Sequence, residues 1–140
     1  MPHTDLTVKS AQLLQFSHNG DDRGQLVALE SKKEIPFAIK RVYYIFDVKN
    51  DIRRGYHAHK KLEQVAVVVR GKCTFMLDDG VSRTDVVLGR PDQGLYIGPM
   101  LWHEMYDFTR DCLLMVMAND DYDESDYIRG HDEFIKLLSC

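Results

Sequence analysis

The sequence predicts an all-β fold in which antiparallel strands form a sandwich or a closed barrel. Three observations carry this prediction: short runs rich in β-branched and aromatic residues recur along the chain, turn residues separate them, and no sustained helical period appears before the C-terminus. A chain of 140 residues has the usual length of one domain. No linker, repeat or low-complexity stretch interrupts it, so we expect residues 1–140 to form a single domain.

The clearest strand covers residues 39–48. Val42, Tyr44 and Phe46 alternate there with Arg41 and Tyr43, and side chains alternate between the two faces of a strand. One face is therefore apolar and the other is mixed. An arginine and a tyrosine that project together into a small barrel indicate a ligand pocket rather than a fully packed interior.

The other expected strands are shorter or more uniformly apolar. Residues 64–69 are nearly all apolar and β-branched, which indicates a strand covered on both faces. Gly71 suits a turn into the next strand, and Asp79-Gly80 predicts a hairpin after that strand. The remaining strands are expected at residues 26–30, 73–77, 85–88, 95–97, 102–108 and 112–117.

The two ends of the chain differ from this pattern. Within residues 125–138 the apolar side chains recur at helical spacing, so we predict a short amphipathic C-terminal helix, weakened in its first half by Gly130. The acidic residues 120–124 lack the spacing of a calcium loop and are expected to form a solvated connection. Residues 1–18 carry no usable pattern and are expected to be an extra or poorly ordered segment.

The composition excludes several classes of function. The net charge of −4 argues against a broad nucleic-acid surface, which needs clustered lysine and arginine. No stretch is apolar for long enough to cross a membrane, and the N-terminus lacks the pattern of a secretory signal. Cys73, Cys112 and Cys140 show no spacing motif and are expected to be structural, small apolar side chains. We therefore expect a cytoplasmic protein that binds neither nucleic acid nor membrane.

A pair of histidines, His57 and His59, is the strongest functional signal. On a strand they point to the same side, so that two imidazoles meet in one cleft. Glu63 shares their parity if the strand continues, and His103 follows later in the chain. Two histidines at this spacing, a glutamate four residues on and a distant histidine resemble the metal-binding pattern of the cupins. Such ligands suit iron, manganese, nickel or zinc.

Paired histidines on a strand can also be ordinary surface residues. Two features favour a site instead. Arg53 and Arg54 place positive charge beside the pair, and Gly55 allows a bend there. Arg41 and Tyr43, on the mixed face of the preceding strand, add polar groups to the same interior.

Four segments in combination resemble the dTDP-4-keto-6-deoxyglucose 3,4-ketoisomerases, a branch of the cupins. The segments are residues 36–45 (PFAIKRVYYI), 54–59 (RGYHAH), 94–97 (GLYI) and 120–129 (DDYDESDYIR), and the likeness extends from about Arg23 to Leu138. The resemblance implies a single cupin-type jelly-roll β-barrel of antiparallel strands with a short C-terminal helix.

The resemblance also implies an activity and a set of site residues. Members of this family move the ketone of a dTDP-linked hexose from C4 to C3, on the route to the aminodeoxy sugars of bacterial surface polysaccharides. They are homodimers with exchanged N-terminal strands, and they are expected to work without a metal or cofactor. The matching positions make His57 the base and His59 its neighbour, with Tyr43 and Arg23 as polar partners of the sugar.

The chemistry of this reaction fits the chain. Moving a ketone to the adjacent carbon needs a base and donors for the developing charge but no hydride carrier, and the sequence has no dinucleotide-binding fingerprint. Arg41 and Arg54 are candidates for the diphosphate because guanidinium groups bind it with paired donors. His103 and Trp102 complete the candidate substrate-binding residues, with packing as the alternative for Trp102.

Two rival interpretations stay open at this point. One is a metal-dependent cupin enzyme, a dioxygenase or isomerase, that uses His57, His59, Glu63 and His103. The other is a sugar-nucleotide-binding cupin without catalytic activity, because a pocket and a catalyst share these residues. The stereochemistry at C4 of the product and the identity of the nucleotide base are also open.

Overall fold

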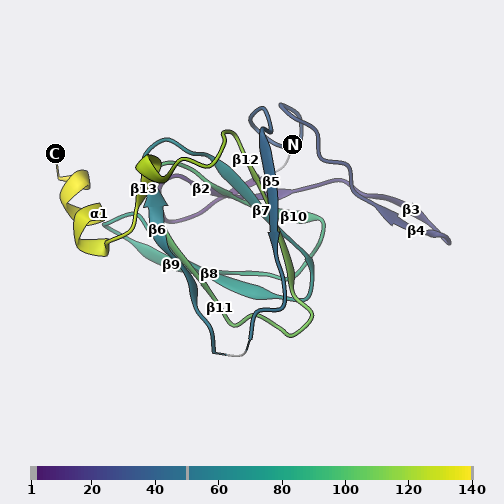
Figure 1. The fold of residues 1–140 in the computed structure, drawn as a ribbon. Coiled ribbons are helices and arrows are strands. Elements are labelled where there is room, and N and C mark those ends of the chain that lie inside the picture. The colour runs from purple at the N-terminus through teal and green to yellow at the C-terminus, as the bar shows by residue number, and fades with distance from the viewer. Residues whose placement is uncertain (1–2, 50, 140) are drawn as a thin grey trace.

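The computed structural model describes residues 3–49 and 51–139, in which two antiparallel sheets pack against each other (Figure 1). The strands are β1 (His3–Asp5), β2 (Ala11–Gln15), β3 (Asn19–Asp21), β4 (Gly24–Leu26), β5 (Arg41–Ile45), β6 (Arg54–His59), β7 (Gln64–Arg70), β8 (Cys73–Asp78), β9 (Arg83–Leu88), β10 (Gln93–Ile97), β11 (Trp102–Tyr106), β12 (Leu113–Ala118) and β13 (Tyr127–Ile128). A 3-10 turn, Glu124–Asp126, precedes β13, and one α-helix, α1 (His131–Leu138), follows it.

The strand order is that of a jelly-roll sandwich. The larger sheet runs β1-β2-β10-β7-β12-β5, and the smaller sheet runs β13-β6-β11-β8-β9. The predicted antiparallel all-β fold with a short C-terminal helix is thus confirmed. The strands of the sandwich form two separate sheets, however, rather than one continuous barrel wall, and β3 and β4 form a third sheet of two strands.

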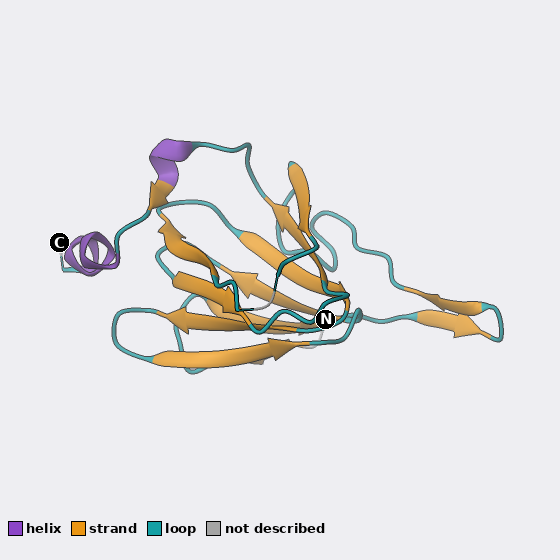
Figure 2. Cartoon of the chain, turned by 60° about the horizontal axis from the view of Figure 1, so that its bottom comes forward, coloured by secondary structure: helices purple, strands orange, loops and turns teal. Residues whose placement is uncertain are grey.

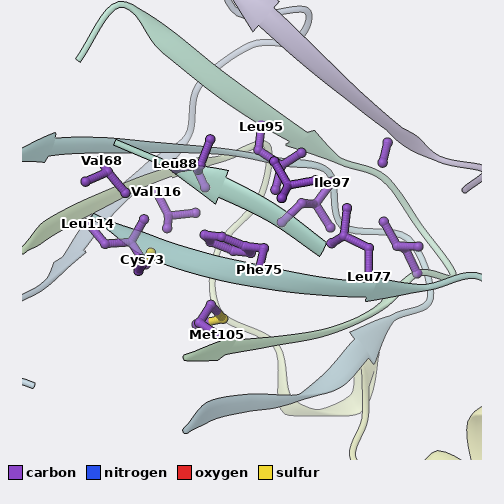
Figure 3. Packing of buried hydrophobic residues seen from close by; sticks show 14 of the residues in the cluster. Val68, Cys73, Phe75, Leu77, Leu88, Leu95, Ile97, Met105, Leu114 and Val116 are labelled. Atoms are coloured by element: carbon purple, nitrogen blue, oxygen red, sulfur yellow. The ribbon is translucent and has the colours of Figure 1, made fainter. Parts of the chain in front are cut away.

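The main core lies between the two sheets (Figure 3). Val68, Leu95 and Val116 reach it from the larger sheet, and Phe75 and Leu77 reach it from the smaller one. All of these side chains are buried. Apolar burial of this kind contributes about 25 cal/mol per Å² and is the dominant favourable term in folding.

Strand β5 ends the larger sheet with an unusual distribution of side chains. Its mixed face, with Arg41, Tyr43 and Ile45, is partly buried against the interior, as the alternation predicted. Its apolar face is exposed, because Val42 and Tyr44 are each more than half exposed. An edge strand with an exposed apolar face is a surface suited to a partner.

The N-terminal segment differs from its expectation. Residues 3–5 and 11–15 form β1 and β2, and β2 pairs with β10 over its whole length. Leu14 and Phe16 are buried against Val65 and Val67 of the larger sheet. Residues 3–5 and 11–15 are therefore strands of the larger sheet, a role that the expectation of an extra or poorly ordered segment did not include. Met1 and Pro2 lie outside the described residues.

The predicted strand at residues 26–30 is wrong for most of its length. Strand β4 ends at Leu26, and together with β3 it forms a hairpin that extends away from the sandwich, on the side opposite α1 (Figures 1 and 2). Val27 and Leu29 pack on the cluster around Phe37 without pairing with a strand. The alternation in the sequence therefore reports burial rather than strand pairing.

The predicted C-terminal helix is shorter than residues 125–138. Gly130 is its N-cap, and the segment before it is extended as β13. The His131 ring bonds the buried carboxylate of Asp78 (Nε2 to Oδ2, 2.8 Å), which fixes the first turn of α1 to the smaller sheet. No helix in the described part of the chain has the length and apolarity to span a membrane.

The buried cysteines agree with the expectation for small apolar side chains. Cys73 and Cys112 are free and buried, and burial raises the pKa of both thiols. Cys140 lies outside the described residues.

Phe134 anchors α1 against the strand that carries the histidine pair. Its side chain is fully buried in a cluster with Ala58 of β6 and Trp102 of β11. Phe134→Ala should lower the free energy of unfolding by about 3–5 kcal/mol, measured by urea denaturation, because it leaves a cavity. Leu137→Ala, on the more exposed side of the same helix, is the control and should cost about 0.5 kcal/mol. Equal losses in the two variants would contradict this account.

Candidate active site

A bulge in β6 sets the direction of the histidine pair. Gly55 and Tyr56 both have left-handed backbone conformations, with φ of 93° and 60°, and the register between β6 and β11 shifts between His103 and Glu104. A Cβ atom at position 55 would lie 2.8 Å from the His103 carbonyl oxygen. Only glycine allows the two backbones to approach so closely. The bulge lets β6 bend here, which is a common device for re-aiming a side chain.

Three imidazoles meet beyond this bulge. His57 pairs directly with His103 across the two strands, and His59 lies on the same face of β6. The ring centroids are 4.6 Å apart for His57 and His103 and 5.0 Å apart for His57 and His59. His59 and His103 are almost completely buried, whereas His57 is half-buried.

Backbone carbonyls determine which nitrogen of two of these rings carries the proton. The Nδ1 of His57 lies 3.1 Å from the Gly55 carbonyl oxygen, and the Nδ1 of His103 lies 3.1 Å from that of Leu101. Because a carbonyl oxygen only accepts, each Nδ1 must be the donor. The Nε2 of each ring is then left with a free lone pair.

Burial holds all three imidazoles, those of His57, His59 and His103, in their neutral form. Burial lowers the pKa of His57 below its ordinary value of 6.5. Burial, followed by the charge of His57, lowers the pKa of His59 to about 3, and burial places the pKa of His103 well below its usual range. A neutral His57 with an unprotonated Nε2 has the protonation state of a general base.

His57 opens into a cavity of about 320 Å³. The cavity lies between β5, β6 and the segment that carries β13, and it is lined by Arg41, Tyr43, Ile45, Arg54, Gly55, His57, Met105, Tyr127 and Arg129. The Tyr43 hydroxyl accepts a hydrogen bond from Gln64 Nε2 (2.9 Å), which leaves its own proton to donate. Burial raises the pKa of Tyr43, so this phenol keeps that proton.

His59 lines a second cavity, of about 210 Å³, beside the first. Arg41 and Tyr127 belong to both cavities and separate them. Neither nitrogen of His59 bonds a residue that the structure describes, although its Nδ1 lies 3.5 Å from the Asp126 carboxylate. The two histidines therefore line different, neighbouring cavities, and both ring nitrogens of His59 are buried without a partner among the described residues.

The structure brings most of the predicted site residues together. His57, Tyr43, Arg41 and Arg54 line one cavity and His59 lines its neighbour. The remaining predicted residues lie outside these two cavities.

His103 and Trp102 were expected to bind the substrate, but neither residue lines the two cavities. His103 is buried behind His57 and supports its ring. Trp102, one residue earlier, points to the other side of β11, where it packs on Phe134 and donates its Nε1–H to Glu104. The packing alternative holds for Trp102, and its placement as a substrate-binding residue is not supported.

Arg23 and Glu63 also lie away from the histidines. Arg23 is on the projecting β3-β4 hairpin, where it is exposed and pairs with Asp21. Strand β6 ends at His59, so the parity argument for Glu63 fails: its carboxylate accepts from Tyr96 and Asn119 instead. Glu63 is therefore not a ligand beside the three histidines.

Sequence reasoning missed the two other polar side chains of the His57 cavity, Tyr127 and Arg129. Both lie in the segment that the helical spacing assigned to the C-terminal helix. The available signal was the alternation of polar Tyr127 and Arg129 with apolar Ile128, which is typical of an extended segment. In the structure Ile128 is buried on one side of this segment, and Tyr127 and Arg129 face the other side.

Comparisons with known proteins show the family of the chain. The family described as FdtA, WxcM-like, C-terminal, matches residues 9–139. The chain is 54% identical over 128 residues to a TDP-4-oxo-6-deoxy-α-D-glucose 3,4-oxoisomerase of Aneurinibacillus thermoaerophilus, covering 91% of this chain and 92% of the relative.

Solved structures of sugar 3,4-ketoisomerases are also similar to this chain. A mutant of the 3,4-ketoisomerase QdtA of Thermoanaerobacterium thermosaccharolyticum, in complex with TDP-4-keto-6-deoxyglucose, is 44% identical with a TM-score of 0.92, over 94% of this chain and 95% of that one. A 3,4-ketoisomerase of Helicobacter canadensis is 47% identical with a TM-score of 0.91, over 93% and 98% of the two chains. With a family match across nearly its whole length and relatives of this identity, the chain belongs to the FdtA family of sugar 3,4-ketoisomerases.

Proposed function

We propose that this protein converts TDP-4-keto-6-deoxyglucose into a TDP-3-keto-6-deoxyhexose. The observation that carries the proposal is the His57 ring, which is neutral, directs its Nδ1 to Gly55 and keeps the Nε2 lone pair for a ligand in the cavity. The complex of the QdtA relative contains a keto sugar of this class. We assign the reaction to the cytoplasm because the free thiols of Cys73 and Cys112 suit a reducing compartment.

The reaction requires a base at C3 of the hexose. The ketone at C4 acidifies the C3 proton, His57 removes it, and an enediol forms. A proton delivered to C4 then completes the isomerisation without net oxidation. A positioned base contributes about 10²–10⁴-fold to such a step, and the Tyr43 hydroxyl is placed to stabilise the developing charge on oxygen.

His59 serves the other end of the proton transfer. Its ring is 5.0 Å from that of His57, and it borders the neighbouring cavity. His57 and His59 line different cavities, so we assign removal of the C3 proton to His57 alone. His59 therefore assists delivery of the proton to C4 or orients the sugar.

The diphosphate of the nucleotide is bound by arginines. Arg41, Arg54 and Arg129 all line the His57 cavity. The Nε and Nη2 of Arg41 are buried and bond no residue that the structure describes. Buried guanidinium nitrogens without a partner require an acceptor, and a diphosphate supplies acceptors in pairs.

Arg23 enters the site of a second subunit in a homodimer. The β3-β4 hairpin that carries Arg23 leaves the body of its own subunit (Figure 2). The exposed apolar faces of Val42 and Tyr44, together with exposed Leu26 on the hairpin, provide a surface for that partner. Exchange of the N-terminal strands would bring Arg23 to the partner's histidines.

A metal-dependent reaction is the second candidate, because His57, His59 and His103 place ligand nitrogens within 4.8 Å of one another. The fit is incomplete. The expected carboxylate, Glu63, is engaged by Tyr96 and Asn119, and arginines line the adjoining cavity, where their charge opposes a cation. The metal-free reaction is therefore the better supported of the two.

Turnover in heavy water tests the proposal and the role of each histidine. The wild-type protein should convert TDP-4-keto-6-deoxyglucose to a 3-keto product, identified by NMR. His57→Asn should lose both turnover and exchange of the C3 proton, because the base is gone. His59→Asn should lose product while some C3 exchange persists, and His3→Asn on exposed β1 should match the wild type.

Two results would contradict this. Binding of the sugar nucleotide without any turnover by the wild type would support the non-catalytic interpretation. Wild-type exchange in the His57 variant would assign the base to another group.

Chelation separates the two enzymatic candidates. A cation on the imidazoles would occupy the lone pairs that the base requires, so activity should survive exhaustive treatment with a chelator. Loss of activity on chelation, restored by one particular cation, would support the metal-dependent reaction.

Complementation tests whether Arg23 acts in the partner's site. Mixed dimers of Arg23→Ala and His57→Asn subunits, isolated through two different tags, should have about half of the wild-type activity, because one of their two sites is intact. Either variant alone should be inactive or nearly so. If the mixed dimer is no more active than its parents, the proposed exchange is wrong.

A further inference from the structure

Tyr127 lies against both catalytic histidines. It pairs with His59 across β13 and β6, and its ring centroid is 4.4 Å from that of His59 and 5.0 Å from that of His57. It borders the cavity of each histidine. No other tyrosine in the described part of the chain lines both cavities.

The ring of Tyr127 is held in place from several directions. The Arg129 guanidinium stacks 4.3 Å from the ring centroid and forms two 2.7 Å bonds with Glu124. On the N-terminal side, the carbonyl of Asp126 accepts from the backbone N–H of Lys60. The ring is therefore positioned by the surrounding chain.

The Tyr127 hydroxyl, by contrast, makes no hydrogen bond to any residue among those described. Tyr127 lines the His57 cavity together with the second phenol of the site, Tyr43. Two phenols thus approach the His57 cavity from different strands, β5 and β13.

The isomerisation moves two protons, not one. The first transfer is between carbons: His57 removes the proton from C3, and a proton is delivered to C4 with the help of His59. In addition, the oxygen at C4 changes from a ketone to a hydroxyl and gains a proton, while the oxygen at C3 changes from a hydroxyl to a ketone and loses one. The second transfer needs a group that donates to one oxygen and then accepts from its neighbour.

We propose that Tyr127 is a further catalytic residue that carries this oxygen-bound proton. As His57 removes the C3 proton, the Tyr127 hydroxyl donates its proton to the C4 oxygen and the enediol forms. As C4 is protonated, the C3 hydroxyl returns a proton to the Tyr127 oxygen and the C3 ketone forms. The tyrosine ends in its starting state, and the proton that His57 took from C3 is the one returned to C4, so no other reactant is consumed.

Tyr43 is less suited to this role. Its oxygen already accepts from Gln64, so its hydrogen is directed as a fixed donor. A proton carrier must donate and accept in turn, which the unbonded Tyr127 hydroxyl can do. This inference rests on the proposed ketoisomerase function and adds the group that serves the two oxygens.

Tyr127→Phe tests the inference because it keeps the ring and removes only the hydroxyl. It should lower kcat by about 10²-fold or more, and C3 exchange should fall with it, because the enediol forms more slowly when no hydroxyl at position 127 donates a proton to the C4 oxygen. Tyr122→Phe, an exposed tyrosine of the same segment, is the matched control and should retain activity.

A second substitution separates a proton carrier from a group that merely fills space. A fluorinated tyrosine of lower pKa at position 127 should shift the alkaline limb of the kcat profile to lower pH, and the same residue at position 122 should not. Near wild-type kcat in Tyr127→Phe, or an unshifted limb with the fluorinated residue, would overturn the inference while leaving the proposed function in place. Failure of the wild type to form product would overturn the proposed function itself.

Discussion

The site depends on the close approach of two backbones at Gly55. A side chain at this position would meet the His103 carbonyl at 2.8 Å, and its φ of 93° is accessible at low cost only to glycine. The bulge that results re-aims β6, so that the Gly55 carbonyl accepts from His57 Nδ1. The conformation of one glycine therefore determines both the direction and the tautomer of the base.

The electrostatics of the cleft follow from burial. Three imidazoles lie together at the edge of an apolar core, and burial lowers the pKa of each, so they stay neutral. The permanent positive charge comes instead from arginines such as Arg41 and Arg129, whose charges lower the pKa of His59 further. The arginines, which stay protonated, can thus attract an anionic nucleotide, while the neutral imidazoles accept and donate protons.

Local pattern in the sequence predicted the antiparallel fold, the histidine pair and the mixed face of β5, because each depends on alternation along a single strand. What it missed depends on the rest of the chain. Strand β2 is defined by its pairing with β10, Tyr127 is extended because it pairs with His59, and the position of Arg23 is completed by another subunit in the proposed dimer. Alternation along β11 also separates Trp102 from His103, because Trp102 packs on the opposite face, in the cluster with Phe134.

Nitrogen-15 NMR of the imidazole of His57 tests the central claim most directly. Long-range correlations between the ring nitrogens and carbon-bound hydrogens distinguish the two neutral tautomers from each other and from the charged ring. The Gly55 hydrogen bond predicts a neutral His57 with the proton on Nδ1 at neutral pH, and burial predicts that it titrates below the ordinary value of 6.5. A Gly55→Ala variant should lose this tautomer preference. A proton on Nε2, or a charged ring at neutral pH, would contradict the assignment of His57 as the base.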